Sequence, residues 1–183
     1  KDQQREIVNM LLANTWEEIE ASFRHIYDHN YALMLTIRNM HMPLPKALGT
    51  PTEFILNEDL CREVQADSID LNRLKSLAAD ARRLSLDLDK ERLRFVAGHK
   101  ISSLMDNFQE SPEDLDLLQT IGKTLEILKT VISDIDLQNA QNIFFNMVKN
   151  RYPEVEAKAG SGDETAAKWI EDFKNLAHQL GLV

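Results

Sequence analysis

Apolar residues recur in steps of three and four through most of the chain, which is the repeat of an amphipathic helix. The longest such stretch runs from Ile7 to Met40 without proline or glycine, and it predicts one long first helix. Its apolar positions are Val8, Leu12, Ile19, Phe23, Ile26, Met34 and Ile37. We expect the segment Met42–Pro45 to end this helix, because proline disfavours helix in the residue before it.

Capping and helix-breaking residues divide the rest of the chain into six further predicted helices. Thr50-Pro51 and Ser111-Pro112 combine a hydroxyl cap with proline at the first helical position. Tyr152-Pro153 is expected to break the sixth helix of the chain, and Gly181 is expected as the C-terminal cap of the last. The expected ranges are 50–66, 70–84, 89–108, 111–132, 136–151 and 163–180.

This pattern predicts an all-α fold. No segment alternates between apolar and polar residues with the period of two that strands require. Seven amphipathic helices joined by short turns favour an antiparallel bundle around the long first helix. A length of 183 residues fits a single helical domain over residues 1–183.

Composition narrows the possible partners. The net charge of -9 repels phosphate backbones, so we expect no nucleic-acid partner. No apolar run approaches the roughly 20 residues of a membrane span, so we expect no membrane partner. The single cysteine, Cys61, cannot form an intrachain disulfide and fits the cytoplasm. Because Lys1 opens the chain inside a helical pattern, we interpret the sequence as part of a longer polypeptide.

Two histidines four residues apart give the one candidate metal site. His25 and His29 share a helix face, as do the histidines of some zinc hydrolases. The acid between them is Asp28 where the commoner motif has glutamate beside the first histidine, and no spacing signals a third ligand. The plain alternative is two surface histidines on a long helix, so we predict no bound metal and no cofactor.

No residue pattern indicates catalysis. Glycosidases need two carboxyl groups across a cleft. In pairs such as Asp134 with Asp136 or Asp87 with Asp89, one acid is better interpreted as a helix cap or first-turn partner. No sequence feature lowers the pKa of the Cys61 thiol, and no glycine-rich phosphate loop is present. We therefore predict no catalytic residue in this chain.

Gln141 falls on the apolar stripe of its helix, with Asn142 beside it. A buried amide must find hydrogen-bond partners or lose about 1–3 kcal/mol. We expect these two residues to tie the helix to another helix or to a loop carbonyl, and ligand binding is the alternative.

Basic residues gather between Leu71 and Lys100, where eight basic and four acidic side chains leave a local charge of +4. The remainder of the chain then carries -13, since -9 minus +4 is -13. We expect a basic face that docks on an acidic surface, and a solvated face with local ion pairs is the alternative. Its candidate residues are Arg82, Arg83, Arg92 and Arg94.

Three stretches together resemble one known family. They are Met42–Leu48 leading to Glu53–Leu60, Asp136–Phe145 leading to Arg151–Glu154, and Gly162–Phe173 running on to Leu180–Leu182; the opening Lys1–Arg5 also fits. The chain resembles the uncharacterised helical domain that follows the catalytic barrel in a branch of glycoside hydrolase family 57, a group of α-amylase-like enzymes.

The resemblance implies a bacterial or archaeal parent protein whose N-terminal glycosidase-like barrel carries the nucleophile and the acid. It implies that this chain is a non-catalytic accessory domain, with the barrel as its partner and polysaccharide as a ligand of the whole protein. It also implies that helices before Lys1 are missing and that an apolar patch is exposed where they packed. The alternatives are a binding module for a glycan or protein, with Trp16 and Tyr31 as exposed aromatic candidates, and a metal-dependent enzyme using His25 and His29.

Overall fold

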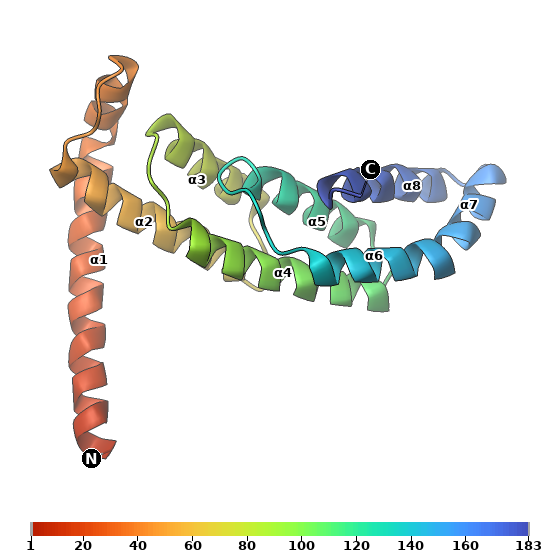
Figure 1. Ribbon diagram of the computed structural model, residues 1–183, viewed down its shortest axis with the longest axis horizontal. Coiled ribbons are helices and arrows are strands. Elements are labelled where there is room, and N and C mark those ends of the chain that lie inside the picture. Colours follow the sequence, from red (N-terminus) through yellow and green to blue (C-terminus); the bar gives the residue numbers. More distant parts are fainter. Residues whose placement is uncertain (1, 183) are drawn as a thin grey trace. The chain divides into compact units, whose positions relative to one another are not determined.

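A computed structural model describes the backbone of residues 2–182 and the side chains of residues 15–182. Eight helices and no strand fall within this part of the chain, which confirms the all-α fold class (Figure 1). The helices are α1 (Asp2–Asn39), α2 (Lys46–Gln65), α3 (Leu71–Arg83), α4 (Lys90–Glu110), α5 (Leu115–Leu128), α6 (Gln138–Asn150), α7 (Tyr152–Gly160) and α8 (Glu164–Gln179). The expected stripe positions Val8 and Leu12, and the side chains of Lys1–Arg5, lie outside the described side chains.

Eight helices are present in the described part of the chain where about seven were expected, because the Tyr152-Pro153 break starts a further helix. Pro153 lies in the first turn of α7. Its ring has no N–H to leave unpaired there, and its fixed φ suits a helix start. The same residue therefore ends α6 and begins α7.

Two helix starts also differ from the expected ones. Helix α2 begins at Lys46, so Pro51 lies inside it, where the missing N–H costs one hydrogen bond. Helix α5 begins at Leu115, and its N-cap is Asp114, whose side chain accepts from the Leu117 N–H (2.9 Å). Ser111, expected to cap α5, instead ends α4.

The caps predicted at Asp89, the expected start of the fourth helix, and at Gly181 are confirmed, and Asp163, the expected first residue of the last helix, is its N-cap. Asp89 accepts from the Arg92 N–H (3.1 Å), and Asp163 accepts from the N–H groups of Thr165 and Ala166. Gly181 has a positive φ of 73°, the conformation that ends helices in a left-handed cap.

The chain forms two compact units. Unit 1 comprises Lys1–Asp59 and Ala79–Leu88, and unit 2 comprises Leu60–Ala78 and Asp89–Val183. The expectations of one domain over residues 1–183 and of a bundle around the first helix stay predictions.

Polar contacts join the helices of unit 1. Arg24 of α1 forms a two-pronged ion pair with the buried carboxylate of Asp59 in α2, with N–O distances of 2.7 and 2.9 Å. Met34 is the one fully buried residue among the described side chains of α1, and its sulfur accepts from the Thr52 hydroxyl (3.3 Å). These contacts hold the C-terminal half of α1 against α2.

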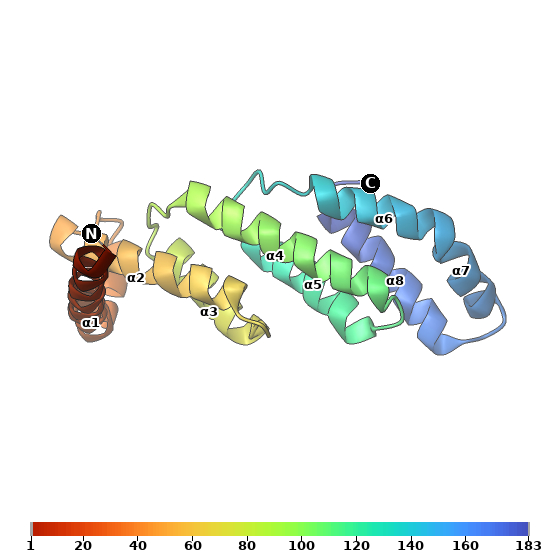
Figure 2. The same ribbon diagram turned by 90° about the horizontal axis from the view of Figure 1, so that it is seen from below.

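Unit 2 contains an antiparallel arrangement. Helices α4 and α6 run in one direction, and α5 and α8 run in the opposite one (Figures 1 and 2). Helix α4 packs on α5 and α6, α5 packs on α8, and α7 packs on both α6 and α8. The α4/α5 pair is therefore antiparallel, whereas the α4/α6 and α5/α8 pairs run parallel.

Stacked aromatic rings form the centre of unit 2. Phe173 of α8 lies between Phe144 (ring centroids 4.2 Å apart) and Trp169 (4.5 Å), both nearly parallel to it. The Trp169 N–H donates to the Pro112 carbonyl oxygen (2.6 Å), so its one polar group is paired. Buried aliphatic side chains of α4, α5, α6 and α8 surround these rings.

Candidate functional site

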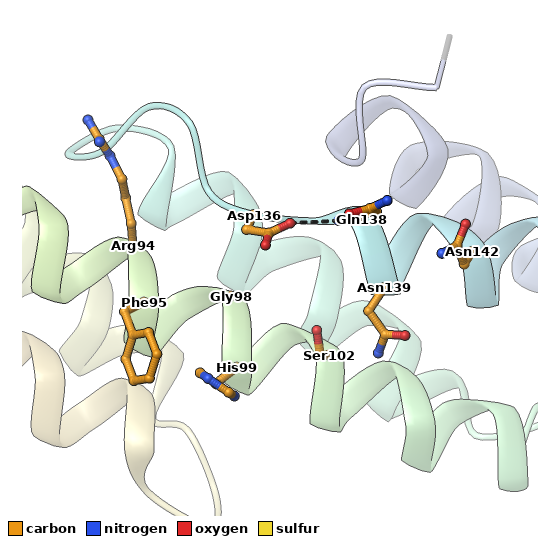
Figure 3. A pocket seen from close by; sticks show the side chains of 9 residues that line it. All are labelled: Arg94, Phe95, Gly98, His99, Ser102, Asp136, Gln138, Asn139 and Asn142. Carbon is orange, nitrogen blue, oxygen red and sulfur yellow. Dashed lines mark hydrogen bonds between the residues drawn. The ribbon is translucent and has the colours of Figure 1, made fainter.

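One hollow of unit 2 lies between α4 and the start of α6 (Figure 3). It encloses about 420 Å³. It is lined by Arg94, Phe95, Gly98, His99, Ser102, Asp136, Gln138, Asn139 and Asn142. Four of these side chains are uncharged and polar, those of Ser102, Gln138, Asn139 and Asn142, so the hollow suits a ligand that exchanges hydrogen bonds.

A second hollow of about 220 Å³ follows toward the C-terminal ends of the same two helices. Gln109 and Pro112 line it on the α4 side, and Asn146 and Asn150 line it on the α6 side. We call the two hollows together the α4/α6 groove.

The loop before α6 closes one end of this groove because two contacts hold it on α4. Arg94 donates from Nε to the Ser133 carbonyl oxygen (3.1 Å), and its guanidinium lies 3.8 Å from the Asp134 carboxylate. Gly98 lets the loop approach, since a Cβ atom there would lie 3.0 Å from the Asp136 carbonyl oxygen. Arg94 therefore holds the loop before α6 in place at the groove.

On the α4 side, Phe95 and His99 point to the same side of the helix (Figure 3). Their rings meet edge to face, with centroids 4.4 Å apart. Phe95 is 67% exposed, which is unusual for a large apolar ring and leaves its surface open to a ligand.

On the α6 side, four asparagines form what we call the amide row: Asn139, Asn142, Asn146 and Asn150. All four are exposed, and all line the α4/α6 groove. Sequence reasoning singled out only Asn142, as a structural contact. The other three asparagines could also have been found from the sequence. The spacings of three, four and four residues along the row keep all four side chains on one helix face.

Gln141, next to Asn142, has a separate task. Its side-chain N–H donates to the Leu180 carbonyl oxygen at the end of α8 (2.9 Å). We expected the Gln141 amide to bond to another helix or to a loop carbonyl. It bonds to the carbonyl oxygen of Leu180, the residue that caps the C-terminus of α8. Asn142 points into the groove and makes no side-chain hydrogen bond within the described chain.

The histidine pair of α1 lies outside this groove. The His25 and His29 rings stack with centroids 5.0 Å apart, and both side chains are exposed. Among the described side chains, no three His, Cys, Asp or Glu residues gather as metal ligands. The metal site at His25 and His29 stays an alternative hypothesis.

The four arginines of the expected basic face fall in different units. Arg82 and Arg83 belong to unit 1, and Arg92 and Arg94 belong to unit 2. Arg83 lies 3.8 Å from Asp80, and Arg94 holds the loop before α6. A shared docking face of these four residues stays a prediction.

The aromatic candidates for glycan binding are engaged within unit 1. The Tyr31 hydroxyl donates to the Asp80 carboxylate, and the Tyr27 hydroxyl lies 3.4 Å from the same group. Burial and the Asp80 carboxylate raise the pKa of both hydroxyls above the ordinary value. Trp16 is 56% exposed and stacks on Phe54. Of the two candidates, Trp16 has the more open ring.

One acid of each carboxyl pair considered for glycosidase chemistry serves a helix start. Asp136 accepts from the Gln138 N–H (3.1 Å), and Asp89 caps α4. Cys61 is a buried free thiol. No helix in the described residues has the length and apolar character to cross a membrane.

No protein-family model matches the sequence, and neither a curated protein nor a solved structure matches it significantly.

Proposed function

We propose that this chain is a non-catalytic accessory domain of a glycoside hydrolase family 57-like protein, and that it packs on and supports the catalytic barrel. Two points support the proposal: the sequence resemblance described above, and the exposure of large apolar side chains in unit 1. Leu33 is 50% exposed, Met40 62% and Met42 44%.

Leu33 lies on α1, and Met40 directly follows the last residue of this helix. The Met40 N–H still donates to the Thr36 carbonyl oxygen (3.1 Å), so the spacing of seven residues puts both side chains on the same face. Apolar side chains exposed on one face are typical of a surface that a partner covers. Burial of such a side chain against a barrel would contribute about 1.5–3 kcal/mol. We propose the cytoplasm as the compartment, in keeping with the lone thiol of Cys61.

The test uses the parent protein with its complete reading frame. The test variant, Leu33→Glu/Met40→Glu, replaces the exposed apolar side chains by glutamates. The control, Ala21→Glu/Ala32→Glu, adds the same charge at exposed positions of α1. We expect the first variant to lower the thermal midpoint of the barrel and its turnover of soluble starch, while the control matches the natural protein. Equal behaviour of the two variants would contradict the accessory role.

The α4/α6 groove supports a second candidate function, a binding module. Its lining of amides and the Ser102 hydroxyl, with the open Phe95 ring at one end, suits a ligand rich in hydrogen-bonding groups. Calorimetric titration of the chain with neutral oligosaccharides and with peptides tests this function. Absence of heat with both ligand classes would exclude it.

A further inference from the structure

The amide row is a regular feature of α6. Asn139, Asn142, Asn146 and Asn150 lie on one helix face, and α6 carries a single charged residue, Lys149. None of the four side chains makes a hydrogen bond to another residue in the described part of the chain. Each carboxamide therefore offers its N–H donors and its carbonyl acceptor to the groove.

The spacing of the row matches an extended polypeptide. Four residues of α-helix advance about 6 Å, which is the step from Asn142 to Asn146 and from Asn146 to Asn150. An extended chain repeats the same edge every two residues, or about 6.6 Å. The rotatable bonds of asparagine absorb the small difference. The whole row spans about 16 Å, the length of roughly five extended residues.

The hydrogen-bonding groups of the amide row also match those of a polypeptide main chain. A side-chain carboxamide and a peptide group carry the same donor and acceptor, so the row can pair with alternate peptide groups along one edge of a strand. We propose that the α4/α6 groove binds an extended peptide segment of a partner protein through its main chain, with the amide row as the binding element. The proposal deepens the second candidate function, on which it rests, and it does not depend on the accessory role.

The groove also indicates which peptide it accepts. Phe95 offers an open apolar ring at the end of the groove near Asp136, where an aromatic or aliphatic peptide side chain can pack. The charged side chains that line the groove balance, with Arg94 and Arg151 against Asp136 and Glu154, which favours an uncharged segment. The partner is therefore an uncharged extended segment with one large apolar residue.

The experiment selects peptides from a random heptapeptide library displayed on phage, with the 183-residue chain as the target. The enriched peptides are synthesised and their Kd values are measured by calorimetry. The test variant, Asn142→Ala/Asn146→Ala/Asn150→Ala, removes three carboxamides of the row. The control, Asn72→Ala/Asn107→Ala/Asn175→Ala, removes three exposed carboxamides elsewhere on α3, α4 and α8. All six positions are exposed, so both variants are expected to keep the thermal midpoint of the natural chain.

We expect the test variant to weaken binding by at least about tenfold and the control to leave it unchanged. N-methylation of alternate peptide nitrogens should weaken binding by a similar factor, whereas alanine at the same positions should not, because the main chain is recognised. Side-chain NH₂ signals of the row should shift in NMR spectra on binding. Phe95→Ala should remove the preference for a large apolar residue.

Three results would overturn the proposal. One is a library that yields no peptide with higher affinity for the natural chain than for the test variant. Another is N-methylated peptides that bind as well as their parents. The last is calorimetry in which a neutral oligosaccharide binds, no peptide binds, and the sugar binding is lost in the test variant. The groove would then be a glycan site. The second candidate function, a binding module, would stand, but its ligand would not be a peptide.

Discussion

Gly98 of α4 packs against the main chain of Asp136, so closely that a Cβ atom at position 98 would lie 3.0 Å from the Asp136 carbonyl oxygen. The contact brings the loop before α6 onto α4 and forms the wall of the α4/α6 groove. Because the opposing atom belongs to the backbone, a larger side chain cannot be accommodated by a change of rotamer.

Gly98→Ala should destabilise the protein for this reason. Alanine favours helix over glycine by about 1 kcal/mol, but displacing the loop costs about 1–3 kcal/mol, so we expect a net loss of about 1 kcal/mol. Gly122→Ala in α5 is the matched control, because nothing lies within 4 Å of a Cβ atom there. The control should gain up to about 1 kcal/mol. Urea unfolding measures both, and a gain for both variants would show that the loop yields without cost.

Tyr27 and Tyr31 should make stability fall at alkaline pH. Burial and the Asp80 carboxylate raise the pKa of both hydroxyls above the ordinary 10.0, so the folded state holds these protons more tightly than the unfolded state. Their contribution is fully present below about pH 10 and is lost as the pH rises through the folded-state values.

Urea unfolding between about pH 8 and 11 tests this dependence. The double variant Tyr27→Phe/Tyr31→Phe should lose the alkaline slope. Near pH 7 it should be about 1–3 kcal/mol less stable, because Asp80 loses two hydrogen-bond donors. An unchanged alkaline slope in this variant would assign the pH dependence to other groups.

Features decided by neighbouring residues could be predicted from the sequence. The caps at Asp89 and Asp163 and the left-handed turn at Gly181 depend on one side chain and the next few backbone groups. The proline signal at Pro153 was misinterpreted because proline both ends one helix and suits the first turn of the next.

The groove could not be predicted in the same way. It exists because α4 and α6, which are separated in sequence by α5, pack side by side. Periodicity shows that a helix has an apolar face but does not show which helix will cover it. The asparagine steps along α6 were visible in the sequence, yet only the packing of α4 beside them turns the row into the lining of a groove.

The histidine pair on α1 should contribute nothing to stability through a metal. His25 and His29 are exposed and supply two ligands, whereas a structural zinc site takes four. We expect dialysis against EDTA to leave the thermal midpoint of the chain unchanged, and His25→Ala/His29→Ala to behave as the natural chain does. Metal that copurifies in equimolar amount, and is absent from the double variant, would instead support the metal-site hypothesis.

The ion pair between Arg24 and Asp59 should be one of the most sensitive contacts in unit 1. Two hydrogen bonds of 2.7 and 2.9 Å join the guanidinium to a carboxylate that is 4% exposed. Arg24→Leu removes both bonds and the contact of Arg24 with Glu20 (3.2 Å), while the carboxylate of Asp59 stays buried. Because the Arg24 side chain is itself 34% exposed, we expect a loss of about 2–4 kcal/mol, below the full value for a buried pair.

Two further variants separate the charge from the packing. Arg82→Leu, at an exposed arginine of α3, should change the free energy of unfolding by no more than about 0.5 kcal/mol. Arg24→Leu/Asp59→Leu should recover most of the loss, because it leaves no carboxylate in the apolar surroundings. If the double variant proves as unstable as Arg24→Leu alone, the contact of the arginine stem with α2, and not the buried charge, carries the effect.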